Sequence, residues 1–358
     1  MAIKIGINGY GRIGRLTHRA LLNRKDGDLQ VVAINGTTNT QDSAYLLRYD
    51  SNYGPLDADV MVGDHSIAVN GREIAILSEQ EPRMIPWGEL GVDVVMECTG
   101  KFRSRHDAAG HLERGAEKVL ISCPAEEVDA TIVLGVNEGE YEPDRHHLIS
   151  ASSCTTVCLA PVCKLLHEQL GMESGLFTTV HSYTNDQRMT DGSHPDPRRG
   201  RSGASNVVPT GSGAARSIGE LLPGLKNKLD GTALRVPTPT VSVADLTATF
   251  ASSITTEQLH ETICSAAKNG LAGVVAFTQD PVVSSDLKGH PASAIIDGDP
   301  RLTFAGPGLM AKIMAWYDNE WSYASRLADL AGLVMNRHRV HDEESFSADS
   351  TGTFVMTA

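Results

Sequence analysis

Cys154 and His181 are the two residues whose types and surroundings most clearly suggest covalent chemistry. Cys154 lies in SASSCTTVC (150–158), among small and hydroxylated residues at the start of an expected helix. Unpaired backbone N–H groups and the helix dipole at such a position favour a thiolate. His181 ends the apolar run GLFTTVH, where it could serve as the base that a nucleophilic cysteine needs. The alternative for Cys154 is a place in the core, since free cysteine is among the most buried residue types.

A helix from Thr155 onward is expected to hold the candidate nucleophile in place. Cys158, Val162 and Leu165 fall on one stripe of this helix, although Pro161 must kink or strain it. Cys158 belongs to that apolar stripe. We therefore expect Cys158 to be a core residue without a chemical role.

The start of the chain predicts a dinucleotide-binding turn. Alternating isoleucines over 3–7 indicate a strand, Gly9 to Gly14 form a GxGxxG turn, residues 15–23 have helical spacing, and residues 29–34 indicate a second strand. In this β-α-β context the glycines let a pyrophosphate approach the N-terminal end of the helix. The alternative is a glycine-rich turn that only packs the helix on the sheet. Further strands of a mostly parallel sheet are expected over the apolar runs 92–96, 119–122 and 131–136.

The end of the second strand, VVAINGTTNT, bears on the choice of cofactor. Gly36 stands where an acidic residue usually hydrogen-bonds the adenosine ribose, and Thr37 and Thr38 follow it with hydroxyl groups. A carboxylate there would repel a 2′-phosphate, whereas glycine leaves room for it. The sequence therefore favours NADP.

Composition defines the setting of this chemistry. The chain has 358 residues, of which 41% are hydrophobic and 21% charged, which suggests about two domains. Its net charge of -13 disfavours nucleic-acid and anionic-membrane partners, so an anionic ligand must meet a local basic cluster. We expect no membrane span and no signal peptide. The six cysteines match neither a disulfide framework nor a zinc pattern, so we expect a cytoplasmic protein without a metal.

Motifs in order from about residue 3 to about residue 335 resemble the phosphorylating glyceraldehyde-3-phosphate dehydrogenase family. They are KIGINGYGRIGR, ASSCTTVCLAP, HSYTNDQ, RRGRSGASNVVPTGSGAA, LRVPTPTVSVADLT and WYDNEWSYASR. The resemblance implies an α/β protein and a homotetramer. Its Rossmann domain, a doubly wound parallel sheet, would span 1–153 and an α+β catalytic domain with a mostly antiparallel sheet 154–319. A C-terminal helix over 320–340 would return to the first domain, and the acidic tail 341–358 is expected to be loosely held, without an assigned role.

The resemblance also implies the reaction. Cys154 would attack glyceraldehyde 3-phosphate as a thiolate, and His181 would lower the thiol pKa and act as acid and base. The Cys154 backbone N–H and His181 would hold the oxyanion, hydride would pass to the nicotinamide, and phosphate would convert the thioester to 1,3-bisphosphoglycerate.

Binding residues follow from the same resemblance, position by position. The substrate phosphate would be bound by Thr184, Asp186, Arg199 and Arg235. Inorganic phosphate would be bound by Ser153, Thr155, Ser212 and Gly213. The cofactor would be bound by Gly9, Gly11, Arg12, Ile13, Gly14, Asn35, Gly36, Thr37, Thr99, Ser122, Ser193, Asn319 and Tyr323. Asn319 would orient the nicotinamide carboxamide, and Tyr323 would line that pocket.

Several positions depart from the family pattern. Val157 stands where CTTN has asparagine, Ser212 replaces the usual threonine, and Ser322 replaces the glycine of WYDNEWGY. In the loop after His181, Gly192 and Ser193 stand where strictly NAD-using relatives carry leucine and proline. This loop would reach the adenosine ribose of a neighbouring subunit. Together with the glycine at the end of the second strand, it favours NADP over NAD, with NAD still accepted.

Three alternatives remain at this point. Erythrose-4-phosphate dehydrogenase shares the architecture, but SYTNDQ and the PTGSG run favour the three-carbon substrate. Aspartate-semialdehyde dehydrogenase shares a Rossmann half and a Cys/His pair but lacks this set of motifs. A non-catalytic interaction protein on the same scaffold would not need Cys154, His181, Arg235 and Asn319, all of which are present.

Overall fold

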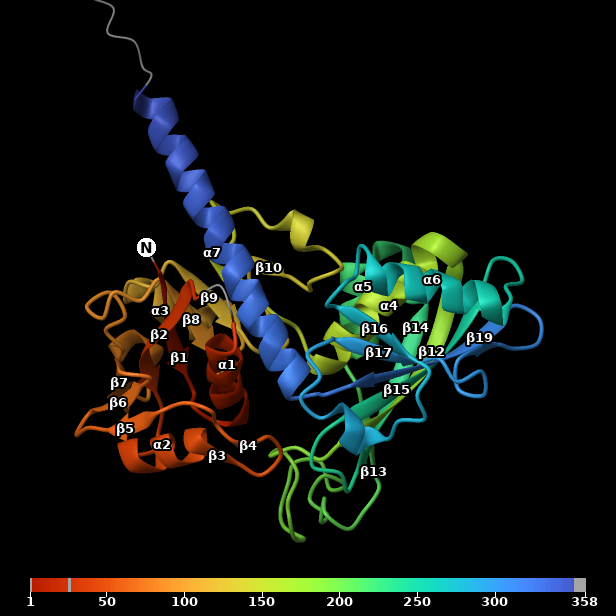
Figure 1. The fold of residues 1–358 in the computed structure, drawn as a ribbon, viewed down its shortest axis with the longest axis horizontal. Helices are drawn as coiled ribbons and strands as arrows, with labels where there is room; N and C mark the ends of the chain where they lie inside the picture. The colour runs from red at the N-terminus through yellow and green to blue at the C-terminus, as the bar shows by residue number, and fades with distance from the viewer. Residues whose placement is uncertain (1, 25–26, 351–358) are drawn as a thin grey trace, which may run out of the picture.

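The N-terminal domain is a nine-stranded sheet whose central strands are parallel (Figure 1). The computed structural model describes residues 2–24 and 27–350, with side chains up to residue 341. In spatial order the strands are β10 (Ala130–Thr131), β11 (Leu148–Ser150), β9 (Lys118–Ile121), β8 (Val94–Glu97), β1 (Ile3–Asn8), β2 (Leu29–Asn35), β7 (Arg72–Leu77), β6 (Ser66–Val69) and β5 (Val60–Val62). Two pairs at one edge of this sheet are antiparallel, β5 with β6 and β6 with β7. Its helices are α1 (Arg12–Leu22), α2 (Thr40–Arg48) and α3 (Arg105–Glu113).

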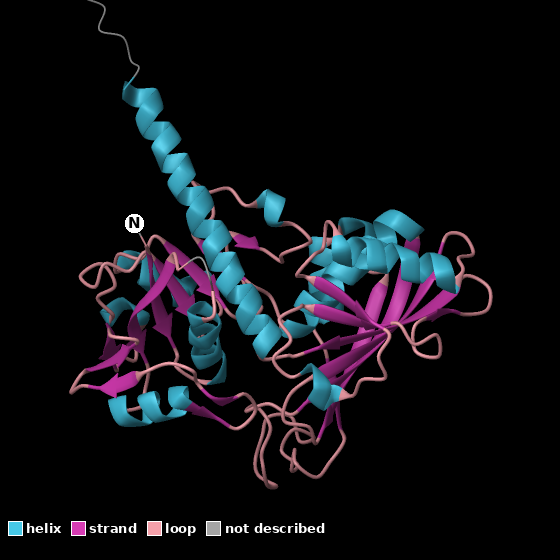
Figure 2. Cartoon of the chain, viewed as in Figure 1, coloured by secondary structure: helices cyan, strands magenta, loops and turns pink. Residues whose placement is uncertain are grey.

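The second domain is an eight-stranded, mostly antiparallel sheet with helices on one face (Figure 2). Its strands in spatial order are β13 (Val208–Gly211), β14 (Leu229–Val236), β12 (Met172–Ser182), β15 (Ser242–Phe250), β19 (Met310–Tyr317), β17 (Ala294–Asp297) and β16 (Val275–Thr278), and β18 (Phe304–Ala305) pairs with β19. The covering helices are α4 (Cys154–Leu170), α5 (Ala214–Leu221) and α6 (Thr256–Lys268). Short pieces complete the chain: β3 (Tyr49–Asp50), β4 (Gly54–Pro55), η1 (Pro82–Met84), η2 (Glu138–Glu140), η3 (Pro223–Leu225) and η4 (Ser284–Leu287).

This arrangement confirms the expected α/β class with its two kinds of sheet. The isoleucines of β1 are fully buried, as in a central parallel strand that is covered on both faces. In β12 buried residues alternate with exposed ones, as in a sheet that has helices on one face only.

The helix α4 links the two domains and begins at the candidate nucleophile. Most of its surface is buried because it packs against the catalytic sheet, α5, α6 and α7. Pro161 lies inside α4 without ending it, and Gly171, with φ of 71°, forms the left-handed cap. The expected disturbance at Pro161 therefore does not interrupt the helix.

The helix α7 (Trp321–Ser350) runs from the boundary between the domains along α1 (Figure 1). Arg24 pairs with Asp329, and Arg339 donates to the backbone of Ala2, so α7 is fastened to the N-terminal domain. The helix continues beyond residue 340, where we expected it to end. The last part of the expected tail, 351–358, lies outside the described residues.

The predicted strand over 131–136 is largely wrong. Only Thr131 belongs to a strand there, because the Asn137 side chain closes a turn: its Oδ1 accepts from Val133 N at 2.9 Å and its Nδ2 donates to Thr131 O at 2.9 Å. Ile132, Val133 and Val136 are buried nonetheless. The apolar residues of this run therefore indicate burial, not a strand.

Candidate active site

Cys154 and His181 meet at the boundary of the two domains. Cys154 is the first residue of α4, where the Ser153 hydroxyl caps the helix by accepting from Thr156 N at 3.2 Å. His181 lies near the end of β12, and its Nε2 is 3.5 Å from Cys154 Sγ. Cys158 lies one turn later and is fully buried, as expected for a core residue. The structure therefore brings Cys154 and His181 together, as the sequence predicted, and places Cys158 in the core.

In the chain alone this pair is a thiol beside a neutral imidazole. Burial raises the pKa of the Cys154 thiol, and the nearby charge of Arg235 opposes this only in part. Burial, and then Arg235, lower the pKa of His181 to about 3. The raised pKa of Cys154 disfavours the thiolate, which the helix start and His181 led us to expect. His181 Nδ1 lies 2.7 Å from Ser182 O, which favours a proton on Nδ1, and 2.7 Å from Arg235 NH1, which disfavours it. In the tautomer with the proton on Nδ1, Nε2 is free to accept the thiol proton.

Arg235 is held next to the pair by strand register. It stands opposite His181 in the parallel pairing of β12 with β14. Its NH1 lies 2.7 Å from His181 Nδ1 and donates to Ser182 O at 3.1 Å. Burial lowers the pKa of this guanidinium. A guanidinium in this place can attract an anionic substrate to the cysteine.

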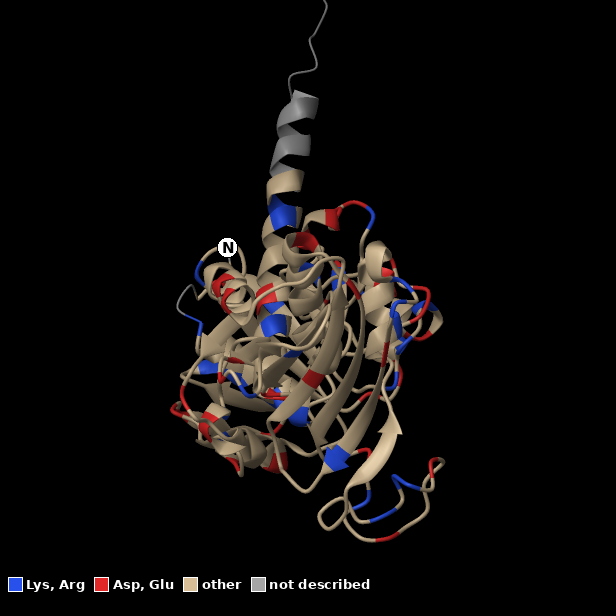
Figure 3. Cartoon of the chain, turned by 90° about the vertical axis from the view of Figure 1, so that its right-hand side faces the viewer, with Lys and Arg blue, Asp and Glu red and all other residues tan. Residues whose placement is uncertain are grey.

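Arg199 is the second arginine of the expected anion site, and carboxylates already neutralise it. Its NH1 lies 2.6 Å from Asp186 Oδ2, and its Nε lies 3.5 Å from Asp196 Oδ2. The Arg199 pair holds the pKa of Asp186 below its ordinary value against the opposing effect of burial. This arginine lies in the loop between β12 and β13, along which acidic and basic residues alternate (Figure 3). An anion bound by Arg199 must compete with both carboxylates.

The hydroxyls expected around inorganic phosphate already have partners. Thr155 Oγ1 lies 3.1 Å from the Tyr317 hydroxyl, which in turn lies 2.7 Å from Thr179 Oγ1. The Thr155 hydroxyl is therefore engaged inside the domain. Ser212 Oγ accepts from Ala214 N at 3.4 Å at the start of α5.

Two other members of the substrate set lie in turns. Thr184 is half-buried in the turn after β12, where its N–H donates to Gln187 Oε1 at 3.3 Å. Gly213 is exposed at the start of α5. Thr184 follows β12 and Gly213 follows β13, the two strands that flank β14 in the sheet.

The glycines of the N-terminal turn have distinct roles. Gly9 has φ of +93°, and a Cβ there would lie 2.6 Å from Thr99 N. A Cβ on Gly14 would lie 2.2 Å from Gly9 O, so α1 packs directly on the turn. A Cβ on Gly11 would meet nothing within 4 Å, which leaves open space above the first turn of α1. The helix start has no side-chain cap, so its first N–H groups, those of Arg12 and Ile13 included, fit a pyrophosphate.

The Arg12 side chain serves the fold rather than this open space. Its NH1 lies 2.6 Å from Asp50 Oδ2, and its Nε donates to Glu320 Oε1 at 2.8 Å. The guanidinium thus ties the glycine-rich turn to the segment before α7. Only its backbone N–H remains for a cofactor.

The end of β2 places the remaining adenosine-side residues. Asn35 is buried, and its side chain donates to Asn8 Oδ1 at 2.7 Å and to Glu79 O at 2.9 Å, so it supports the strand ends. A Cβ on Gly36 would lie 3.6 Å from Tyr10, an ordinary contact. Thr37 is exposed. Space for a larger ligand group therefore exists here.

Glu97 is a buried residue at this end of the sheet that sequence reasoning missed. It accepts from Thr99 N at 2.7 Å and from Asn8 Nδ2 at 2.5 Å, and its backbone carbonyl accepts from Ser122 N at 2.9 Å. It thereby holds both Thr99 and Ser122, two of the expected cofactor residues. A lone acidic residue at the end of the apolar run VVME was the available signal.

The WYDNEW motif supplies the other end of the cofactor site. Asn319 is buried, and its Oδ1 accepts from Ser242 Oγ at 2.9 Å. The Tyr323 hydroxyl donates to Ser152 O at 2.8 Å, which joins α7 to the segment before the nucleophile. Asp318 was missed: it is fully buried and accepts from Tyr53 and other donors. An aspartate inside an aromatic motif was the signal for it.

Ser193 is the one expected cofactor residue on the catalytic domain's surface loop. It is exposed, and its carbonyl accepts from Arg188 Nε at 3.1 Å. Gly36 and Thr37, by contrast, follow β2 in the N-terminal domain.

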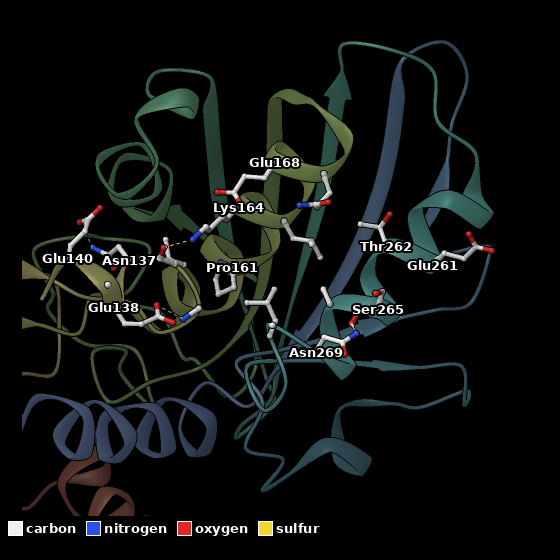
Figure 4. A pocket seen from close by; sticks show the side chains of 18 of the residues that line it. Asn137, Glu138, Glu140, Pro161, Lys164, Glu168, Glu261, Thr262, Ser265 and Asn269 are labelled. Carbon is white, nitrogen blue, oxygen red and sulfur yellow. Dashed lines mark hydrogen bonds between the residues drawn. The ribbon is translucent and has the colours of Figure 1, made fainter. Parts of the chain in front are cut away.

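One large cavity lies apart from Cys154 and His181. A cavity of about 930 Å³ lies at the far end of α4 and does not include Cys154 or His181; residues lining it include Pro161, Lys164, Glu168 and Asn269 (Figure 4). Lys164 Nζ donates to Val136 O there. Among residues 2–24 and 27–350, no helix is long and apolar enough to cross a membrane. The same residues contain no cluster of His, Cys, Asp and Glu suited to a metal ion.

Comparisons with known proteins agree with this geometry. Residues 3–105 match the family model of the glyceraldehyde 3-phosphate dehydrogenase NAD-binding domain, and residues 153–319 match the C-terminal domain of the same family. The chain is 49% identical over 337 residues to glyceraldehyde-3-phosphate dehydrogenase of Geobacillus stearothermophilus, covering 94% of this chain and 99% of that protein. It is 48% identical over 338 residues to the Streptomyces coelicolor enzyme, covering 94% and 100%. The chain therefore belongs to the glyceraldehyde-3-phosphate dehydrogenase family.

Proposed function

We propose that the chain is a phosphorylating glyceraldehyde-3-phosphate dehydrogenase, which converts glyceraldehyde 3-phosphate and inorganic phosphate to 1,3-bisphosphoglycerate and reduces NAD(P). The observation that carries the proposal is the 3.5 Å approach of Cys154 Sγ to His181 Nε2 beside Arg235. A nucleophile, a base and a cation in one place suit an anionic aldehyde.

His181 starts the reaction by taking the thiol proton at Nε2. Cys154 Sγ then bonds to the aldehyde carbon, and the developing oxyanion lies near the Cys154 backbone N–H at the start of α4 and near the protonated His181. A bound nicotinamide supplies the hydride acceptor that oxidation of this adduct to a thioester requires. Phosphate attacks the thioester, the carbon–sulfur bond breaks, and Cys154 is released as the leaving group.

Proton transfer must begin from a thiol in this scheme. Burial disfavours the thiolate in the chain alone. An arriving substrate and cofactor change this environment, and the neutral His181 can take the proton as attack proceeds.

Two anion sites serve the two phosphates. Arg235 lies next to the pair, and Arg199 with Thr184 forms the outer part of the substrate-phosphate site, where Asp186 holds the Arg199 side chain. The start of α4, with Ser153 and Thr155, and the start of α5, with Ser212 and Gly213, would bind inorganic phosphate through backbone N–H groups.

NADP is the proposed preferred cofactor, with NAD also accepted. Gly36 carries no carboxylate and leaves room at the end of β2, and Thr37 supplies a hydroxyl. Ser193 would reach this place from a neighbouring subunit of a homotetramer. Exposed Leu176 and Met310 on the uncovered face of the catalytic sheet support such an assembly.

Steady-state kinetics test this proposal directly. NAD and NADP are compared side by side with glyceraldehyde 3-phosphate and erythrose 4-phosphate, in the presence of phosphate. We expect the highest kcat/KM with the three-carbon aldehyde. A higher value for the four-carbon aldehyde would assign the substrate to the rival dehydrogenase, and no turnover with either would indicate a non-catalytic interaction protein.

A further inference from the structure

We propose that Ser242 is a positioning residue that decides which end of the Asn319 amide faces the nicotinamide. The inference rests on the proposed role of Asn319 in binding that ring. It begins at the strained segment Thr240–Ser242, which leads into β15. Val241 has φ of 65°, in the left-handed region that a β-branched residue rarely adopts. Such a conformation persists only where the surrounding contacts hold it.

The two hydroxyl residues on either side of Val241 bind two consecutive residues of the WYDNEW motif. Thr240 Oγ1 donates to Asp318 Oδ1 at 2.8 Å. Ser242 Oγ donates to Asn319 Oδ1 at 2.9 Å. The left-handed conformation of Val241 thus lets the side chains on either side of it bind Asp318 and Asn319.

Val241 itself is held by the strand that carries the base. Its carbonyl accepts from Ser182 Oγ at 3.0 Å. Ser182 follows His181, and the Ser182 carbonyl lies 2.7 Å from His181 Nδ1. One residue thus contacts both the base and the strained segment.

A chain of donors fixes the direction of the Asn319 amide. The Ser182 backbone N–H donates to Ser242 Oγ at 3.1 Å, and a backbone N–H can only donate. The Ser242 oxygen therefore accepts on that side, and its own hydrogen is available for Asn319 Oδ1. Were the amide reversed, its NH₂ would face Ser242 and the Ser242 hydrogen would lose this acceptor. The observed orientation leaves the Asn319 NH₂ as the end that can donate to a carboxamide oxygen.

Burial makes this hydrogen bond hard to replace. Ser182, Ser242 and Asn319 are at most 5% exposed, so bulk water does not substitute for a missing hydroxyl. Without Ser242 Oγ, the Asn319 amide loses the donor that selects its orientation. Cofactor binding then suffers at the nicotinamide end alone.

The first test compares Ser242→Ala with Ser174→Ala. Ser174 Oγ pairs with Thr249 Oγ1 in the same sheet, far along β12 from His181, and serves as a matched control. Affinities are measured for NAD(P) and for ADP-ribose, which lacks the nicotinamide. We expect Ser242→Ala to weaken NAD(P) binding by about tenfold, with ADP-ribose unchanged. Ser174→Ala should change neither affinity, and Ser242→Thr, which keeps the hydroxyl, should restore most of the NAD(P) affinity.

A second measurement distinguishes a changed orientation of the Asn319 amide from a general loss of structure in Ser242→Ala. In a thionicotinamide dinucleotide, sulfur replaces the carboxamide oxygen and is a poorer acceptor. Wild type should discriminate against this analogue, and Ser242→Ala should discriminate less. Equal loss of ADP-ribose and NAD(P) affinity would overturn the positioning role, because it would indicate a structural defect.

Asn319→Ala distinguishes a failure of the role proposed for Ser242 from a failure of the nicotinamide contact proposed for Asn319. If Asn319→Ala weakens NAD(P) binding and Ser242→Ala does not, the role of Ser242 is wrong and the proposed function stands. If Asn319→Ala has no effect either, the proposed nicotinamide contact is wrong, and the role of Ser242 is overturned with it.

Discussion

The glycine-rich turn and the cysteine cluster, Cys154 with His181 and Arg235, are built in opposite ways. The turn spans Gly9 to Gly14, consecutive residues whose backbone and missing side chains create the open space. The residues of the cysteine cluster come from α4, β12 and β14 and meet through side-chain atoms. The turn should therefore be sensitive to added atoms, and the cysteine cluster to removed functional groups.

The largest expected effect comes from removing the sulfur of the cysteine cluster. Cys154→Ser should lower turnover by about 10³-fold or more, because a serine hydroxyl ionises far less readily than a thiol. Cofactor affinity should remain nearly unchanged, since the turn is intact. Steady-state kinetics and dinucleotide titration measure the two quantities.

Alkylation gives a control for this assignment within one helix. Iodoacetamide should label Cys154 far faster than the fully buried Cys158. The Cys154 rate should rise with pH through the alkaline range, because its pKa lies above the ordinary value. Equal labelling of the two cysteines, or substantial turnover by Cys154→Ser, would contradict the nucleophile assignment.

Arg235→Leu tests the cation of the cysteine cluster. Loss of a charge-assisted contact costs about 1.5–3 kcal/mol, so KM for the phosphorylated aldehyde should rise by about tenfold or more, with little change for the dinucleotide. An aldehyde without phosphate, such as glycolaldehyde, should be affected much less. Equal losses for both aldehydes would show that Arg235 acts through its contacts with His181 and Ser182 instead.

The glycine-rich turn offers a matched pair of additions. Gly14→Ala places a Cβ 2.2 Å from Gly9 O, a backbone atom that cannot move aside, and should cost about 1–3 kcal/mol in the free energy of unfolding. Gly11→Ala meets no atom within 4 Å, so it should leave stability nearly unchanged and weaken dinucleotide binding. Denaturant unfolding and cofactor titration separate the two effects. Equal destabilisation by both changes would refute the distinction between a packing glycine and a binding glycine.

The sequence predicts the contiguous turn more fully than it predicts the cluster whose residues come from three separate elements. The turn is contiguous, so a spacing rule located its glycines, including the ones that pack and the one that leaves space. In the cysteine cluster, local patterns located Cys154 at a helix start and His181 at a strand end, and the family resemblance supplied Arg235. Their convergence depends on the register of β12 with β14, which neither segment encodes alone.

The remaining differences come from partners that are distant in sequence. The Arg12 guanidinium pairs with Asp50 and Glu320, and the Thr155 hydroxyl lies 3.1 Å from the Tyr317 hydroxyl, so both side chains have protein partners that the motifs do not show. The side-chain amide of Asn137 closes a turn where the apolar run 131–136 predicted a strand. Side-chain hydrogen bonds of this kind have no periodicity, so apolar spacing could not reveal them.

Buried histidines in the two regions predict how stability depends on pH. Burial lowers the pKa of His181 to about 3 and that of His18 to about 4, from the ordinary value of 6.5. Both remain neutral when folded, so the unfolded state binds more protons below pH 6.5, and stability falls as pH falls. Each histidine should contribute a slope of up to about 1.4 kcal/mol per pH unit between pH 6 and 5.

Urea unfolding at pH 7 and pH 5 measures this loss, and His181→Asn should lose less stability over that interval than wild type. A free energy of unfolding that is equal at the two pH values would contradict the neutral burial of both residues.

The smallest expected effect is at the edge of the cofactor site. Gly36→Asp should fit, because a Cβ there lies 3.6 Å from Tyr10, and it should shift the ratio of kcat/KM for NADP over NAD toward NAD. A carboxylate about 4 Å from one phosphate charge contributes about 4 kcal/mol at an effective dielectric of 20, before screening. Gly36 is half-buried, and solvent and salt still screen a charge there, so about 1 kcal/mol or less should remain, which corresponds to a several-fold change.

The measurement must hold ionic strength fixed, because salt weakens this repulsion and leaves an uncharged ribose contact almost unaffected. Raising salt should therefore reduce the effect of Gly36→Asp with NADP more than with NAD. Wild type should favour NADP over NAD under the same conditions. A strong wild-type preference for NAD, together with a ratio that Gly36→Asp does not move, would show that cofactor choice is set by other residues around the adenosine.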